Sequence, residues 1–151
     1  MGKPITTQNK ENGSLFESMF KARAQINGML CEKNHLTARY LPGGRVKVVK
    51  SELDYRVVTQ DGKVGYFDCK TLSGHSFTYS MIDEAQLERS VTHNYWRVPS
   101  GFIVWFRSSN QIVFYKGADI KLKGAGCSFE ATDGRLLGRI ENFDLKLIMA
   151  V

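Results

Sequence analysis

Apolar residues between positions 13 and about 33 recur three and four residues apart, the spacing of one face of an α-helix. Ser14 stands where the N-cap of this helix is expected, and Glu17 follows three residues later, as in a capping box. A purely structural role as a helix cap is therefore open to Glu17. The apolar stripe comprises Leu15, Phe16, Met19, Phe20, Ala22, Ile26, Met29 and Leu30.

Residues 36–53 alternate valines with basic residues on either side of a Pro-Gly-Gly turn, which predicts a β-hairpin with one solvated face. This is the most basic stretch of the chain, and its cations suit contacts with a phosphate backbone. A merely solvated, charged hairpin is the alternative interpretation. The basic residues are Arg39, Arg45, Lys47 and Lys50.

Residues 54–59 and 63–71 are expected to form two strands around Gln60-Asp61-Gly62, because Asp-Gly is a strong hairpin signal. After a loop, a second helix is predicted from an N-cap at Ser80 to about Trp96. A continuous apolar run follows at 102–107, which is typical of a central strand, with a partner strand at 111–116.

The order helix, strands, helix, strands predicts an α/β domain with a mixed β-sheet flanked by helices. We expect a flexible basic arm at 1–12 and a single domain at 13–151, with its core at about 13–116. The remaining residues, 117–151, are expected to be a strand-rich extension. Its strand-like runs lie around Ile120, Phe129, 136–140 and 145–149.

Length and composition are consistent with one soluble domain: 151 residues, of which 42% are hydrophobic, can bury one sizeable core. The net charge of +6 favours a polyanionic partner, nucleic acid first. The three cysteines are widely spaced and form no zinc motif, so we expect a reduced, cytoplasmic chain. No apolar run approaches the roughly 18 residues that a membrane span needs, and no membrane partner is expected.

The chemically informative residues are Asp54, Asp68 and Lys70. Asp68 and Lys70 are separated by one residue on a predicted strand, so their side chains share one face. Two carboxylates and a main-chain carbonyl suit Mg²⁺, a hard ion that prefers oxygen ligands. Bound Mg²⁺ acidifies a water molecule, and a neighbouring lysine can orient that water or offset phosphate charge. This chemistry is that of phosphodiester hydrolysis.

The turn between the two strands decides whether Asp54 joins this group. A two-residue turn would place Asp54 opposite Cys69, with its side chain on the wrong face. A three-residue loop with a bulge would place Asp54 opposite Asp68, with their Cβ atoms about 5 Å apart. A magnesium-dependent nuclease therefore requires a bulged turn or an equivalent irregularity.

Asp54 followed by Asp68-x-Lys70, after a helix carrying Glu17, resembles the PD-(D/E)xK nuclease superfamily, although Leu53 replaces its proline. Within it, the stretches GSLFESMF, DYRV, GYFDCKTLSGHSF and EAQLERS resemble the small Holliday-junction resolvases of the bacterial RecU and archaeal Hjc type, including phage forms. Ala85 replaces the histidine that often precedes the glutamine of such proteins. The resemblance covers residues 13–116.

This resemblance implies a restriction-endonuclease-like core and assigns roles to individual residues. Asp54, Asp68 and the carbonyl of Cys69 would ligate Mg²⁺, with Mn²⁺ as a substitute, and Lys70 would be the catalytic lysine. Glu17 would act through water or a second metal ion, and Gln86 would lie near Lys70 or the scissile phosphate. No organic cofactor is implied. We also expect His75, in the loop at 72–79, to contact a phosphate, with simple exposure as the alternative.

The resemblance further implies a homodimer that cuts two opposed strands of a four-way DNA junction, in a bacterial, archaeal or phage-infected cell. The leading expectation is thus a Mg²⁺-dependent endonuclease that resolves Holliday junctions by paired symmetric nicks. The alternatives are a restriction-like or repair nuclease on duplex DNA and a DNA-binding module that does not cleave.

Overall fold

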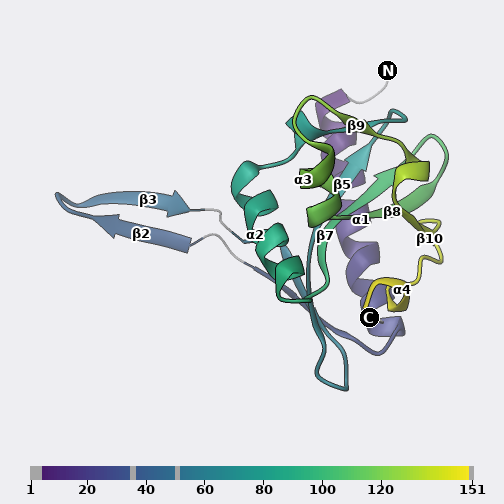
Figure 1. The fold of residues 1–151 in the computed structure, drawn as a ribbon, viewed down its shortest axis with the longest axis horizontal. Coiled ribbons are helices and arrows are strands. Elements are labelled where there is room, and N and C mark those ends of the chain that lie inside the picture. The colour runs from purple at the N-terminus through teal and green to yellow at the C-terminus, as the bar shows by residue number, and fades with distance from the viewer. Residues whose placement is uncertain (1–4, 35–36, 50–51, 150–151) are drawn as a thin grey trace.

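A six-stranded mixed β-sheet with helices on both faces forms the body of the protein, and a separate two-stranded hairpin projects from it (Figure 1). The computed structural model describes residues 5–34, 37–49 and 52–149. The sheet order is β1-β4-β5-β7-β8-β10, in which only β5 and β7 run parallel. The sheet strands are β1 (Leu30–Lys33), β4 (Tyr55–Val58), β5 (Val64–Leu72), β7 (Ser100–Phe106), β8 (Gln111–Lys116) and β10 (Arg135–Gly138).

Two apolar clusters, one on each face of the sheet, hold the layers together. Helix α1 (Ile5–Ile26) and the short α4 (Lys146–Met149) pack on one face, around Phe16, Phe20 and Phe67. Helix α2 (Glu84–Tyr95) and α3 (Gly117–Lys123) cover the other. The central strand β7 is buried along its whole length, as its continuous apolar sequence predicted.

Helix α1 differs from its prediction at both ends. It starts at Ile5, so residues 5–12 are helical and not part of a loose arm; residues 1–4 lie outside the described part of the chain. It ends at Ile26, where Gly28 adopts a positive φ of 73°, and the chain then enters β1. Ser14 is therefore inside the helix, and the capping role considered for Glu17 is ruled out.

The buried face of α1 also differs from the expected stripe. Phe16, Phe20 and Ala24 are at most 1% exposed, whereas Leu15 and Ile26 are 47% and 67% exposed. These three buried residues are spaced four apart, so their side chains lie on the same face of the helix. Aromatic packing selects this line, because Phe16 meets Trp105 and Phe143, and Phe20 meets Tyr55.

The predicted hairpin is present as β2 (Thr37–Leu41) and β3 (Arg45–Val49), which pair only with each other. It extends away from the sheet and helices (Figure 1). Gly43 and Gly44 both have positive φ, so the Pro-Gly-Gly segment makes the turn as expected.

The segment after β8 contains fewer strands than its sequence suggested. The runs around Ile120 and at 145–149 are helical, as α3 and α4, and not extended. Burial of Ile120, Leu145 and Ile148 against the two sheet faces accounts for their apolar character. The remaining short elements are β6 (Phe77–Thr78), β9 (Ser128–Phe129) and the 3₁₀ turns at Tyr79–Met81 and Ala131–Asp133.

Helix α2 begins later than predicted, since Asp83 rather than Ser80 is its N-cap. The Asp83 carboxylate accepts a hydrogen bond from the main-chain N–H of Gln86, 3.2 Å away. None of the described helices is long and apolar enough to cross a membrane. The three cysteines are free, as expected from their spacing.

The β4–β5 turn is the irregular one that the nuclease hypothesis required. Thr59 N donates to the Lys63 carbonyl at 2.9 Å, which leaves a three-residue loop with Gly62 at a φ of 87°. The ladder then runs from Val58 opposite Val64 to Tyr55 opposite Phe67. Continued by one step, this register brings Asp54 opposite Asp68, and their carboxyl groups interact.

We predict that Gly62→Ala lowers the free energy of unfolding by about 1–2 kcal/mol, because a side chain disfavours this left-handed conformation. Chemical denaturation measures the loss. Gly74→Ala is the matched control: neither glycine has another atom within 4 Å of an added Cβ, and Gly74 has no positive φ. Equal losses in the two variants would contradict the prediction.

Candidate active site

The candidate site lies where β4 and β5 separate. Their ladder ends at the pair Tyr55–Phe67, whereas β5 continues beside β7 to Leu72. Along 68–72 the β4 side of β5 therefore has no paired strand within the described chain. Phe67 packs on the α1 face, so alternation directs Asp68 and Lys70 toward the α2 face.

We call the point where β4 leaves β5, after the pair Tyr55–Phe67, the fork. Asp68 and Lys70 form an ion pair there. Lys70 Nζ lies 3.0 Å from Asp68 Oδ2, with the Asp68 side chain 1% exposed and that of Lys70 28% exposed. Burial raises the pKa of Asp68 to about 7; the Asp54 carboxyl beside it adds to the rise, and Lys70 opposes it. The structure thus brings the three predicted residues together. Without a bound cation, the ionised form of Asp68 is destabilised.

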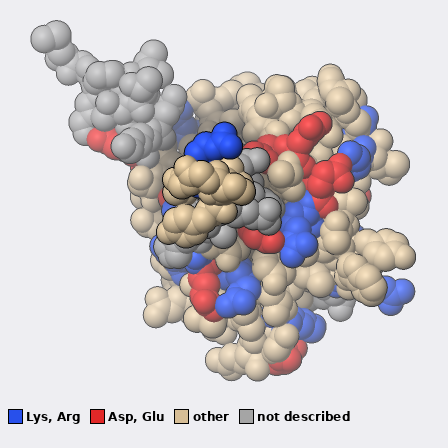
Figure 2. All heavy atoms as spheres, turned by 90° about the vertical axis from the view of Figure 1, so that its left-hand side faces the viewer, with Lys and Arg blue, Asp and Glu red and all other residues tan. Residues whose placement is uncertain are grey.

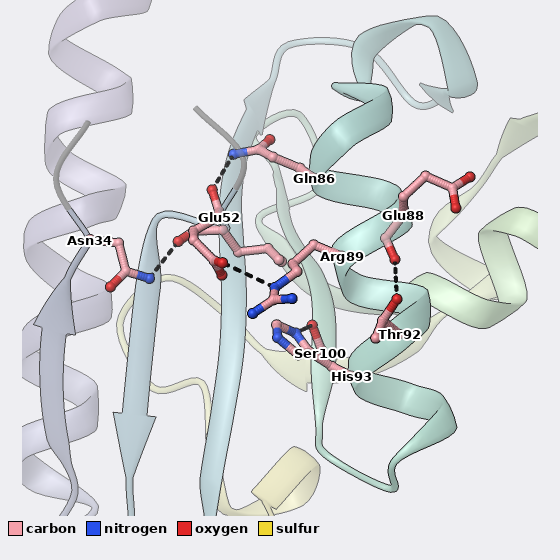
Figure 3. Close-up of polar contacts among 9 residues, drawn as sticks. Asn34, Glu52, Gln86, Glu88, Arg89, Thr92, His93 and Ser100 are labelled. Atoms are coloured by element: carbon pink, nitrogen blue, oxygen red, sulfur yellow. Dashed lines mark hydrogen bonds and ion pairs between the residues drawn. The ribbon is translucent and has the colours of Figure 1, made fainter. Parts of the chain in front are cut away.

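Hydrogen bonds to three successive carbonyls fix the segment that carries Asp54, and Figure 3 shows those donated by the side chains of Asn34 and Gln86. Asn34 donates its main-chain N–H to the Asp54 carbonyl at 2.7 Å and its Nδ2 to the Leu53 carbonyl at 2.8 Å. Gln86 Nε2 donates to the Glu52 carbonyl at 3.2 Å. Leu53 is fully buried between these contacts. We call Asn34 and Gln86 the main-chain clamp of Asp54.

Helix α2 is attached to the sheet beneath this clamp by polar contacts that Figure 3 also shows. Arg89 Nε lies 3.0 Å from Glu52 Oε1, and His93 Nδ1 lies 3.0 Å from Ser100 Oγ. The His93 ring stacks on Tyr66, with centroids 4.2 Å apart. Burial, together with the Arg89 charge, lowers the pKa of His93, which favours the neutral form of its ring.

Gln86 is 1% exposed, and its side chain contacts the main chain before Asp54. It therefore supports the segment that carries Asp54, and the implied position near Lys70 or the scissile phosphate stays a prediction. Asn34 was not among the predicted site residues. The apolar stripe predicted a helix as far as position 33, whereas Asn34 directly follows the strand β1. No local sequence motif identifies an asparagine at the end of a strand as a site residue.

Glu17 approaches the fork from the opposite face of the sheet. Its Oε1 lies 3.8 Å from Lys33 Nζ, and it is among the groups that raise the pKa values of Tyr55 and Cys69, after burial. Asp54 and Asp68 also raise the pKa of Cys69, so the charges of all three acids act on this thiol. Glu17 is near the fork without joining the Asp68–Lys70 pair.

The donors at the fork fit a hard divalent cation. Asp68 Oδ1 is buried and has no hydrogen-bond partner among the described residues, so the protein leaves an acceptor unfilled. In the described part of the chain, no three His, Cys, Asp or Glu side chains are grouped closely enough to hold a metal. Two carboxylates and the Cys69 carbonyl, completed by water or phosphate oxygens, match Mg²⁺ or Mn²⁺ coordination.

The predicted DNA-contacting residues are only partly described. Arg45 is exposed at the start of β3, whereas Lys50 and the side chains of Arg39 and Lys47 lie outside the described part of the chain. On the face from which the hairpin projects, basic and acidic side chains are interspersed (Figure 2). His75 is exposed, and its Nδ1 lies 3.3 Å from Ser108 Oγ, across the ends of β5 and β7.

The fold is that of the restriction-endonuclease-like proteins, as expected. The comparison with solved structures found the Holliday junction resolvase Hjc of the archaeal hyperthermophile Archaeoglobus fulgidus, at a TM-score of 0.58 and 10% identity. The alignment covers 85% of this chain and 97% of that one. No family model and no curated protein sequence matches. At this identity the likeness establishes the fold, and the activity has to be argued from the site.

We predict that Asp68→Asn stabilises the protein above neutral pH when divalent cations are removed with EDTA. The folded-state pKa of about 7 exceeds the ordinary 3.8, so the folded protein binds more protons between those values. Its stability therefore falls as pH rises from about 4 to 7. Thermal unfolding at pH 8 should show a gain of about 1–3 kcal/mol that disappears near pH 4. A pH-independent effect would contradict this.

We predict that Asn34→Ala weakens Mn²⁺ binding about tenfold, because Asp54 loses part of its main-chain support. Isothermal titration calorimetry measures the affinity. Asn27→Ala is the control, since it also removes one side-chain hydrogen bond, from Leu145 N at 3.0 Å, far from the fork in the chain. Each variant should lose about 1 kcal/mol of stability. Equal Mn²⁺ affinities in the two variants would argue against the clamp.

Proposed function

We propose that this protein is a Mg²⁺-dependent endonuclease that resolves four-way DNA junctions by paired symmetric nicks. The observation that carries the proposal is the convergence of Asp54, Asp68 and Lys70 at the open fork of β4 and β5. The Hjc-like fold supports the choice of a branched DNA substrate, since the Archaeoglobus protein is a Holliday junction resolvase.

In the proposed reaction, Asp54, Asp68 and the Cys69 carbonyl would hold the cation. Bound Mg²⁺ would supply positive charge to the phosphate and acidify a water molecule. The ammonium of Lys70, held beside Asp68, contacts the phosphate or orients the attacking water. Asn34 and Gln86 keep Asp54 in position through its main chain. Glu17 contributes through a water molecule on the opposite side of the fork.

Symmetric cutting requires two such sites, because one chain carries one fork. We propose that the protein acts as a homodimer, in which a two-fold axis relates the sites as it relates opposed strands of the junction. The projecting hairpin, with Arg39, Arg45, Lys47 and Lys50, and the exposed His75 would contact the DNA backbone.

Incubation with Mg²⁺ and either a four-way junction or a linear duplex of the same sequence tests the proposal. Paired nicks at symmetric positions of the junction are the expected result. Cutting of the duplex would instead indicate a restriction-like or repair nuclease, and tight binding without cutting would indicate a DNA-binding module. Sedimentation of the protein–junction complex shows whether two chains are present.

We predict that Asp68→Asn and Lys70→Ala each reduce junction cleavage at least about 100-fold while leaving junction binding intact. Lys63→Ala is the control, since Lys63 is an exposed cation on the β4–β5 turn. Cleavage measured at saturating protein separates catalysis from binding. Normal cutting by either site variant would disprove the assigned roles.

A further inference from the structure

A cavity of about 720 Å³ lies at the end of the sheet where β7 begins and β8 ends. This volume is within the range of small-molecule binding sites. Its apolar walls include Phe114, Tyr115, Ile120 and Phe129, which extend from the cores on both faces. The cavity thus offers apolar and aromatic surface to a ligand.

Three cations at the cavity have no carboxylate partner. The side chains of Arg97, Lys116 and Arg135 make no ion pair or hydrogen bond with the described residues. Lys123, the fourth, is occupied, because its Nζ lies 3.6 Å from Asp133 and donates to the Ser128 carbonyl at 2.7 Å. The carboxylates of the lining are Asp133, which is paired with Lys123, and Asp119, so positive charge is in excess and favours an anionic ligand.

Arg97 occupies a position where glycine is normally favoured. Its φ is 62°, and it follows Trp96, the C-cap of α2, with the Val98 N–H donating to the His93 carbonyl at 2.8 Å. Helices that end in this way usually carry glycine, because other residues are strained there. An arginine that accepts this strain at the edge of a cavity points to a function of its side chain.

Two exposed aromatic residues directly precede Arg97. Tyr95 and Trp96 are 80% and 72% exposed, and their rings meet edge to face at 5.6 Å. Large exposed rings beside arginine are the groups that stack on nucleobases. The three consecutive residues Tyr95, Trp96 and Arg97 therefore combine base-stacking and phosphate-binding chemistry.

We propose that this cavity binds a nucleotide, with the phosphate on Arg97, Lys116 and Arg135 and the base against the apolar and aromatic surface. The site is distinct from the fork. Asp68 pairs with Phe102, and the cavity begins at Ser100, two residues earlier on β7 and about 7 Å away along the strand. From there it extends across β8 to Arg135 at the start of β10, on the side of β7 away from β5. It requires no metal and stands independently of the proposed cleavage.

Isothermal titration calorimetry with deoxyadenosine 5′-monophosphate, in the presence of EDTA, tests this site. The expected dissociation constant is below about 1 mM. Inorganic phosphate and deoxyadenosine, each tested alone, should bind at least about tenfold more weakly, because each fills only half of the site. A phosphate affinity equal to that of the nucleotide, or no nucleotide binding, would overturn the proposal.

Arg97→Gly is the most informative variant, because glycine suits the positive φ and the fold is preserved. It should weaken nucleotide binding about tenfold, and Arg97→Lys should restore part of the loss. Arg139→Ala, which removes an exposed cation outside the cavity, should change nothing. Unchanged nucleotide binding by Arg97→Gly would overturn the proposal. A loss of binding that is accompanied by altered sedimentation of the variant, and is therefore due to a changed fold, would overturn it too.

The source of the nucleotide is resolved by comparing the monophosphate with a single-stranded oligodeoxyadenylate. Equal affinity per site supports a free nucleotide, and much tighter binding of the strand that is lost in Arg97→Gly supports a nucleotide within a DNA chain. Tight binding of the strand that is unaffected by Arg97→Gly, together with no binding of the monophosphate, would overturn the proposal.

Discussion

The register of β4 against β5 is the constraint on which the candidate site depends. Because side chains alternate between the faces of a strand, a slip of one residue would move Asp54 to the α1 face and away from Asp68. The three-residue loop that ends in Gly62 sets this register. Aromatic packing of Tyr55 and Phe67 against α1 then secures it, because neither ring could turn outward without loss of core contact.

The cost of placing Asp68 at the fork is electrostatic. A buried carboxylate beside a second carboxyl is unfavourable, and one ammonium at 3.0 Å offsets only part of that cost. The surrounding structure therefore has to hold the group in place. Asn34 and Gln86 do so without touching either carboxylate, by binding main-chain carbonyls, and they leave Asp68 Oδ1 available for a ligand. Such local instability is common where a protein acts on charged substrates.

The two ends of α2 belong to different proposed sites. Gln86, in the first turn, supports Asp54, whereas Asn94 and Arg97, at the other end, line the cavity. Contacts of Arg89 and His93 with the sheet hold the helix between them. Both proposed sites thus rely on one helix, while the proposed metal and nucleotide binding would involve different side chains and can be measured separately.

The predicted strands were largely recovered, since alternation and turn residues are local signals. Helix boundaries were harder to predict. The polar residues at 5–12 carry no strong helical pattern, and Leu30 extended an apolar stripe that in the structure continues as a strand. The error at the end of the helix hid the strand that precedes Asn34. The error at its start suggested a capping role for Glu17, which lies well inside the observed helix. Likewise, short apolar runs after β8 are compatible with helix or strand, and only their packing decided between them.

The sequence by itself placed Asp68 and Lys70 on one face, because strand geometry has a period of two. It left two registers open for Asp54, and the three-residue loop seen in the structure decided between them. Tertiary structure decided what surrounds them. The clamp joins residues 34, 52 to 54 and 86, and the cavity joins residues 97, 116 and 135. These residues are far apart in the sequence and meet only because α2 and the segment after β8 pack on the sheet. Their spacing along the chain therefore gives no signal.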